Sequence, residues 1–215
     1  MVDEIVRYGI GRDVNPDAGT HAIANDPAEL AASAAATMRS WHEFPYYPRR
    51  YGERGWRFSL SDGGWLTTLC DSPAAGAREQ VAWLGRLLAA RGMPHLLLER
   101  HLGFLHEALL ERLQGQAKRY ARLPECAAFL RERRVAILAE SRFESLARDF
   151  ESATLGASGG IANFGAVLVA AVIDDRAGIP GVVESVTTWA TDVTRFDERW
   201  CAAVGATLAA ARAAI

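Results

Sequence analysis

The sequence has few cysteines, and their placement excludes two kinds of cross-linked fold. Its three cysteines are Cys70, Cys126 and Cys201, and no two of them form a CxxC pair. An odd number of widely separated cysteines fits neither a disulfide framework nor a zinc knuckle. We therefore expect free thiols and a reducing, cytoplasmic location.

The sequence also lacks the apolar segments that membrane insertion or secretion requires. Its longest nearly uncharged apolar run, residues 161–173, has 13 residues, whereas a spanning helix needs ~20. Near the N-terminus, Asp3, Glu4 and Arg7 interrupt any apolar core of a secretory signal. We expect a soluble protein that has no membrane partner.

Neither sign of charge is in large excess. The chain has 24 Lys and Arg residues against 26 Asp and Glu residues, a formal net charge of -2. General binding to nucleic acid rests on a basic field, so this balance predicts no nucleic-acid partner. The local basic run between residues 118 and 134 is interpreted as a solvated helix surface.

Helical periodicity is abundant, and glycine and proline divide it into segments. Leucines recur at helical spacing over residues 98–113, after Pro94, and apolar residues do so over residues 182–208. Residues 161–175 are apolar nearly all round, which predicts a central helix, although a buried strand shows the same composition. With no alternating strand pattern, the sequence predicts an all-α, single-domain bundle of six or more helices.

The element boundaries follow from glycine and proline. Residues 1–26 are rich in glycine, asparagine and aspartate and predict an irregular N-terminal arm, and residues 27–215 form the expected bundle domain. We expect one helix from Pro124 to about Thr154, and one long helix or two nearly collinear helices from Val182 onward. Breaks in the aromatic stretch are expected at Gly52, Gly55, Gly63 and Gly64.

The strongest functional signal is an aromatic and basic stretch at residues 41–65. It contains 8 of the 19 aromatic residues, interleaved with arginines. Aromatic faces stack on planar groups, and guanidinium groups bind carboxylate or phosphate. The sequence therefore predicts a small-molecule-binding protein for a planar or anionic ligand, with haem or another tetrapyrrole as one candidate. The expected ligand-binding residues are Trp41, His42, Tyr46, Tyr47, Arg49, Arg50, Tyr51, Arg54, Trp56 and Trp65.

Two alternatives from other classes remain open. The same tyrosine, tryptophan and arginine side chains are typical of protein interfaces, which would make the chain a regulatory interaction module or a homodimer. The second alternative is a metal-dependent enzyme, because His95 and Glu99 lie one helical turn apart and can reach one ion. Glu140 and Glu144 would complete that site from a second helix, and His101 is the candidate axial ligand of a haem.

Overall fold

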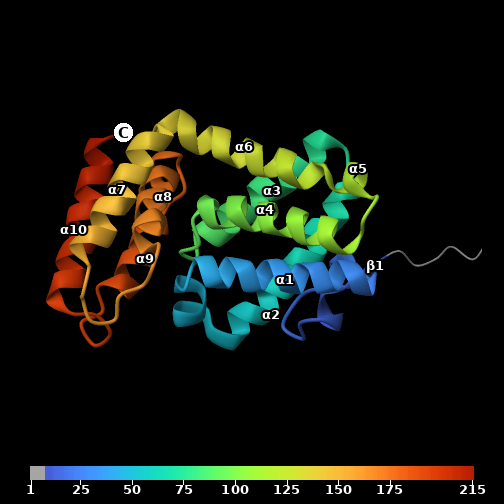
Figure 1. Ribbon diagram of the computed structural model, residues 1–215, viewed down its shortest axis with the longest axis horizontal. Coiled ribbons are helices and arrows are strands. Elements are labelled where there is room, and N and C mark those ends of the chain that lie inside the picture. Colours follow the sequence, from blue (N-terminus) through green and yellow to red (C-terminus); the bar gives the residue numbers. More distant parts are fainter. Residues whose placement is uncertain (1–7) are drawn as a thin grey trace, which may run out of the picture. The chain divides into compact units, whose positions relative to one another are not determined.

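The all-α class and the irregular N-terminal arm are both confirmed by a computed structural model, which describes residues 8–215. No helix in this part of the chain is long and apolar enough to cross a membrane. The helices are α1 (Pro27–Glu43), α2 (Tyr46–Thr68), α3 (Ala74–Ala89), α4 (His95–Arg112), α5 (Ala117–Tyr120), α6 (Arg122–Ile137), α7 (Glu140–Ala153), α8 (Phe164–Arg176), α9 (Val182–Ala190) and α10 (Glu198–Ala213) (Figure 1).

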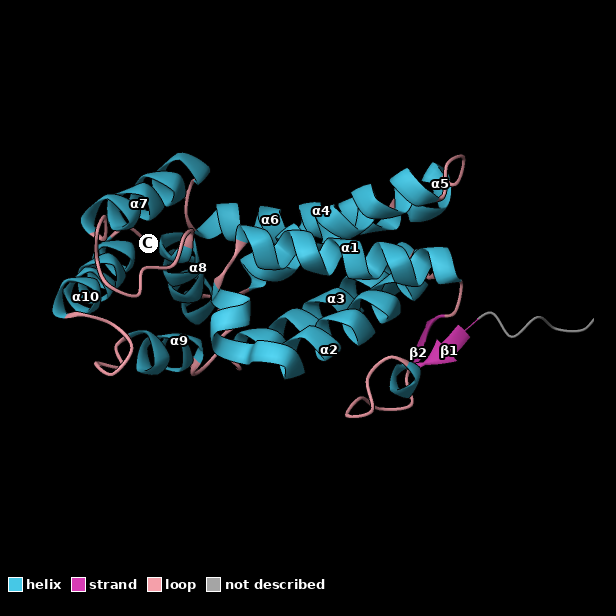
Figure 2. Cartoon of the chain, turned by 60° about the horizontal axis from the view of Figure 1, so that its bottom comes forward, coloured by secondary structure: helices cyan, strands magenta, loops and turns pink. Residues whose placement is uncertain are grey.

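The described part of the arm contains a small antiparallel strand pair that the sequence did not predict. Strand β1 (Tyr8–Ile10) pairs with β2 (Ala22–Ala24), and Gly9 lies opposite Ile23 (Figure 2). Three residues are too few to show an alternating pattern, so the strands left no periodic signal. Ile23 is buried and lies against Gly64 of α2, which fixes the end of the arm.

The contacts between Cα atoms divide the chain into two compact units. Unit 1 contains residues 8–42, 47–81 and 100–127, and unit 2 contains residues 43–46, 82–99 and 128–215. Each unit has its own buried apolar residues. The expectation of one domain over residues 27–215 stays a prediction.

Small residues allow the helices of unit 1 to approach closely. The Ser33 hydroxyl on α1 donates a hydrogen bond to the carbonyl of Leu60 on α2, at 3.3 Å. A Cβ atom placed on Gly63 would lie 2.1 Å from Ser33 Oγ, so only glycine fits there without displacing a neighbour. Leu102 and Leu105 of the predicted leucine stripe are fully buried, whereas Leu113 lies beyond the end of α4 and is half-buried.

Helix α8 is the centre of unit 2. Ten of its 13 residues are buried, which confirms the predicted central helix and shows that the alternative of a strand was wrong. The rings that contact Phe164 of α8 come from α2, α7, α9 and α10. Trp200 of α10 also stacks on Phe196 at 5.1 Å and packs edge-on against Phe150 at 5.0 Å. The Trp200 indole N–H donates to the carbonyl of Ala190 at 3.0 Å, so this buried polar group is satisfied.

Several predicted boundaries were wrong. The single helix expected from Pro124 to about Thr154 is two helices, because Ala139 has a non-helical ψ of 140° and separates α6 from α7 without a glycine or proline. For the last stripe the expectation of two helices was correct, because residues 191–197 separate α9 from α10, and Asp197 caps α10 by accepting from the Trp200 amide at 2.8 Å. Within the aromatic stretch only Gly52 interrupts the helix, whereas Gly55, Gly63 and Gly64 lie inside α2.

Candidate functional site

The aromatic–arginine face lies in unit 1, where α1 ends and α2 begins. We define it by four aromatic and three arginine side chains: Trp41, Tyr47, Tyr51, Trp56, Arg49, Arg50 and Arg54. Gly52 lies in the middle of this segment with φ 54° and ψ -153°, a conformation that glycine adopts at low cost. The resulting kink in α2 brings rings from both sides of it, Tyr47 and Trp56, against Trp41.

Trp41 is the central ring of this face. The Tyr47 ring lies nearly parallel to it, at an interplanar angle of 3° and a centroid distance of 6.0 Å. Trp56 packs edge-on at 5.2 Å and 90°, and Tyr51 extends the row at 6.5 Å from Tyr47. The parallel and the edge-on arrangement are both favourable for aromatic pairs. All four rings are half-buried, so they form an ordered surface that is not absorbed into the core.

The ring spacing determines how a planar ligand can bind. A flat ring between two parallel rings would need a gap of about 7 Å, which is two van der Waals contacts. Trp41 and Tyr47 are closer than that, at 6.0 Å between centroids. A planar ligand would therefore stack on the outer side of the row.

The arginines in and near the face differ in the number of acidic groups that pair with them. Arg57 lies one helical turn after Arg54, outside the face, and forms ion pairs with Glu53 at 2.9 Å and with Asp17 at 3.5 Å. By contrast, the Arg54 side chain is 74% exposed, and its contacts in the described chain are a longer ion pair to Asp17 at 3.7 Å and the ring of Phe58, 5.3 Å away. Arg49 is also exposed. Arg49 and Arg54 are therefore the guanidinium groups best placed to meet an anion from solvent.

The Trp41 indole N–H is shielded from solvent and has no acceptor among residues 8–215. A buried donor without a partner costs about 1–3 kcal/mol. Such unsatisfied groups are rare in folded proteins and often mark sites of function or of bound water. The orphan donor lies on the central ring of the face.

Three of the predicted ligand-binding residues lie outside the face. Tyr46 belongs to unit 2, where it is fully buried against Phe164 and its hydroxyl donates to the Gly92 carbonyl at 2.6 Å. Trp65 follows Trp56 by nine residues along α2, which is about 13 Å of helix. His42 is adjacent to the face on the last turn of α1, and its side chain is exposed.

The predicted metal ligand Glu99 does face Glu140, but the cation between them is Arg134. Both Glu99 oxygens accept from the Arg134 guanidinium at 3.0 Å, and Glu140 accepts from it at 3.1 and 3.2 Å. Glu144 lies on the surface, 3.5 Å from Arg148. Of the two carboxylates expected to face Glu99, only Glu140 does so, and the group between Glu99 and Glu140 is a guanidinium.

His95, the other predicted metal ligand, pairs with Asp174 of α8. The Asp174 carboxylate accepts from the His95 amide at 2.7 Å and lies 3.0 Å from Nδ1 of the ring. It therefore caps the start of α4 and orients the imidazole. Within residues 8–215, no group of three or more histidine, cysteine, aspartate or glutamate side chains is arranged to hold a metal ion.

His101, the candidate axial haem ligand, is buried in unit 1. Its Nδ1 lies 2.9 Å from the Ser40 hydroxyl, and its Nε2 is shielded and has no partner in the described chain. Nε2 is directed toward Gly63, since a Cβ atom placed there would be 3.6 Å away. Burial lowers the pKa of His101 to about 4, so the ring is neutral at pH 7. This close packing of α2 places helix backbone where an axial ligand of His101 would lie.

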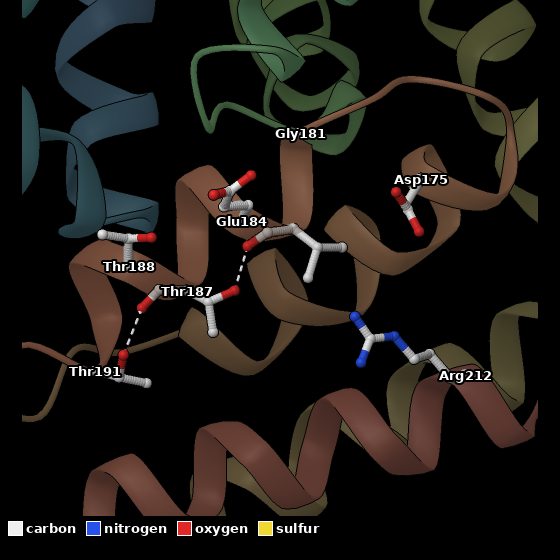
Figure 3. A pocket seen from close by; sticks show the side chains of 8 residues that line it. Asp175, Gly181, Glu184, Thr187, Thr188, Thr191 and Arg212 are labelled. Atoms are coloured by element: carbon white, nitrogen blue, oxygen red, sulfur yellow. Dashed lines mark hydrogen bonds between the residues drawn. The ribbon is translucent and has the colours of Figure 1, made fainter.

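One polar hollow was not predicted from the sequence. In unit 2 an open polar hollow of about 500 Å³ has a lining from the end of α8, from α9 and from the end of α10: Asp175, Gly181, Val183, Glu184, Thr187, Thr188, Thr191 and Arg212 (Figure 3). In the sequence, the local feature that marks the hollow is the group of three threonines at residues 187, 188 and 191. Arg212 lies 21 residues beyond it, so sequence proximity could not connect the two.

Comparisons of the chain with protein-family models, with curated proteins and with solved structures found no match.

Proposed function

We propose that this protein binds a planar small molecule that carries an acidic group, and that the aromatic–arginine face is its binding site. The observation that carries the proposal is the ordered row Tyr47–Trp41–Trp56, half-exposed beside the open guanidinium groups of Arg49 and Arg54. The ligand ring stacks on the aromatic row, and the arginines bind its carboxylate or phosphate.

Two further features support this proposal. The orphan N–H of Trp41 offers a hydrogen bond to an acceptor on the ligand, once a small shift of the outer rings opens a path to it. Asp17 forms ion pairs with both Arg57 and Arg54. Charged side chains therefore surround the aromatic centre of the face. Ligand sites commonly combine an aromatic lining with a few charged groups in this way.

The cellular location belongs to the same proposal. The three cysteines are free thiols in the described chain, as their number and spacing predicted. Burial raises the pKa of the Cys70 thiol to about 12, so this side chain stays protonated and is a poor nucleophile. We infer a role in a reducing compartment, the cytoplasm.

The test compares two ligands that differ only by an acidic group. Flavin mononucleotide and riboflavin share one ring system, and only the former has a phosphate. Tryptophan fluorescence titrations should show tighter binding of flavin mononucleotide, by roughly ten- to hundredfold for one charge-assisted contact. The double variant Arg49→Gln/Arg54→Gln should remove that difference, while Arg133→Gln, an exposed arginine of unit 2, should leave it unchanged. Equal affinity for both flavins in the unaltered protein would contradict the proposal.

A specific observation also favours a second function for this surface, contact with another protein or with a second copy of the chain. Met38 lies one turn before Trp41 on α1 and is 57% exposed, so it extends the aromatic row with an apolar side chain. Aromatic residues, methionine and arginine are enriched at interfaces. Native mass spectrometry tests the contact with a second copy: a dimer that Met38→Lys and Trp56→Lys each dissociate supports the interface, and a monomer at high concentration excludes the dimer.

A further inference from the structure

The polar hollow of unit 2 contains charges of both signs that do not pair with one another. Arg212 extends from the last turn of α10 toward α8 and α9 (Figure 3). Asp175 and Glu184 lie on the other walls, and all three side chains are exposed. Within residues 8–215, Arg212 forms no ion pair within 4 Å with either acid. Arg212 and the two acids therefore do not neutralise one another through a direct ion pair.

The threonines give the hollow a defined hydrogen-bonding polarity. The Thr191 hydroxyl donates to the Thr187 carbonyl at 2.9 Å, and the Thr187 hydroxyl donates to the Val183 carbonyl. Because both hydroxyl hydrogens are used within α9, the oxygens face a ligand as acceptors. The hydroxyl oxygens of Thr187 and Thr191 thus accept hydrogen bonds, whereas Arg212 only donates them.

This arrangement selects a particular charge type. A simple anion would meet Arg212 but also two carboxylates, and a simple cation would meet the guanidinium. A ligand that carries both charges satisfies each side. The volume of about 500 Å³ lies within the usual range for small-molecule sites, and the lining is polar apart from Val183 and Gly181.

We propose that this hollow binds a small zwitterion of the α-amino acid class. The carboxylate of the ligand pairs with the Arg212 guanidinium, and its ammonium group faces Glu184 and the threonine oxygens of α9. This site shares no residue with the aromatic–arginine face, so the two proposals succeed or fail independently.

The experiment follows backbone amide shifts of residues 181–191 in ¹H–¹⁵N spectra of the full chain at pH 6.5. The probe is L-serine, compared with N-acetyl-L-serine, which lacks the ammonium group, and with L-serinamide, which lacks the carboxylate. L-Serine should give saturable shifts, and each analogue should require a roughly tenfold or higher concentration. No saturable shift with L-serine, or equal binding of all three compounds, would overturn the proposal.

Variants locate the two ends of the ligand. Arg212→Gln should weaken L-serine binding by roughly ten- to hundredfold and should abolish the preference over L-serinamide. Glu184→Gln should reduce the preference over N-acetyl-L-serine. Arg176→Gln removes the same charge from an exposed position at the end of α8, outside the hollow. This variant should therefore bind L-serine with the same affinity as the unaltered protein. Unchanged affinity in Arg212→Gln would disprove the assignment.

Discussion

The Ser40 hydroxyl lies 2.9 Å from Nδ1 of His101, while Nε2 of the same ring is buried without a partner in the described chain. This histidine is 7% exposed, and the neighbours identified around its ring, Ser40 and Gly63, are uncharged. Protonation would place a positive charge in the core of unit 1 without a counter-ion. The neutral imidazole is therefore part of the folded state.

Stability should fall on acidification because of this residue. The pKa of His101 is lowered to about 4 in the folded protein, from 6.5 for an ordinary histidine, so the unfolded chain binds the additional proton first. The loss begins near pH 6.5 on lowering the pH and is complete below pH 4, and it amounts to roughly 3 kcal/mol. Urea denaturation between pH 7.5 and pH 3.5 measures it.

His101→Gln provides the matched variant for this pH dependence. It removes the titrating group, so its stability should change less over the same pH range. His42→Gln, which removes an exposed histidine of the same unit, should retain the full slope. If His101→Gln and the unaltered protein lose stability equally, another group is responsible.

Arg134 should be among the most sensitive positions of unit 2. Its side chain is 6% exposed and that of Glu99 is 10% exposed, so Arg134→Met leaves a buried carboxylate without its partner. Such a loss typically destabilises a protein by about 3–5 kcal/mol. Chemical denaturation measures the effect. Arg131→Met, which removes the exposed partner of Glu140, should cost at most about 1 kcal/mol. Similar values for the two variants would show that the buried pair has no special weight.

Alanine substitution at two glycines should change the stability of the protein in opposite directions. At Gly52 a methyl group meets no atom within 4 Å, so the cost of Gly52→Ala comes from the backbone alone, at φ 54° and ψ -153°, and is about 1–3 kcal/mol. Gly205 is exposed inside α10 and also has open space, so Gly205→Ala should stabilise the protein by about 0.5–1 kcal/mol. Thermal denaturation of both variants checks the signs. A stabilising Gly52→Ala would contradict the kink.

The sequence predicted the helices better than it predicted their partners. Pro27 and Pro94 marked helix starts correctly, and the composition of residues 161–175 indicated the central position of α8. The break at Ala139 was missed because no glycine or proline marks it. The pairing of His95 with Asp174 joins residues 79 apart in the chain, and that of Glu99 with Arg134 joins residues 35 apart. Such contacts depend on helix packing, which local periodicity does not encode.

The candidate site was predicted only in part for the same reason. The composition of residues 41–65 identified the aromatic–arginine face, but it did not separate Tyr46, which packs in unit 2, from Tyr47 beside it. Periodicity assumed a regular helix, whereas the kink at Gly52 determines which rings meet.

The most direct test of the central claim is a ¹H–¹⁵N spectrum of the tryptophan indole groups during titration with flavin mononucleotide. Binding at the aromatic–arginine face should shift the indole resonances of Trp41 and Trp56 with one common dissociation constant. The Trp200 resonance should stay in place, since this indole is fully buried in unit 2 and bonded to Ala190. Saturation without any shift of Trp41 or Trp56 would show that the ligand binds elsewhere and would contradict the account.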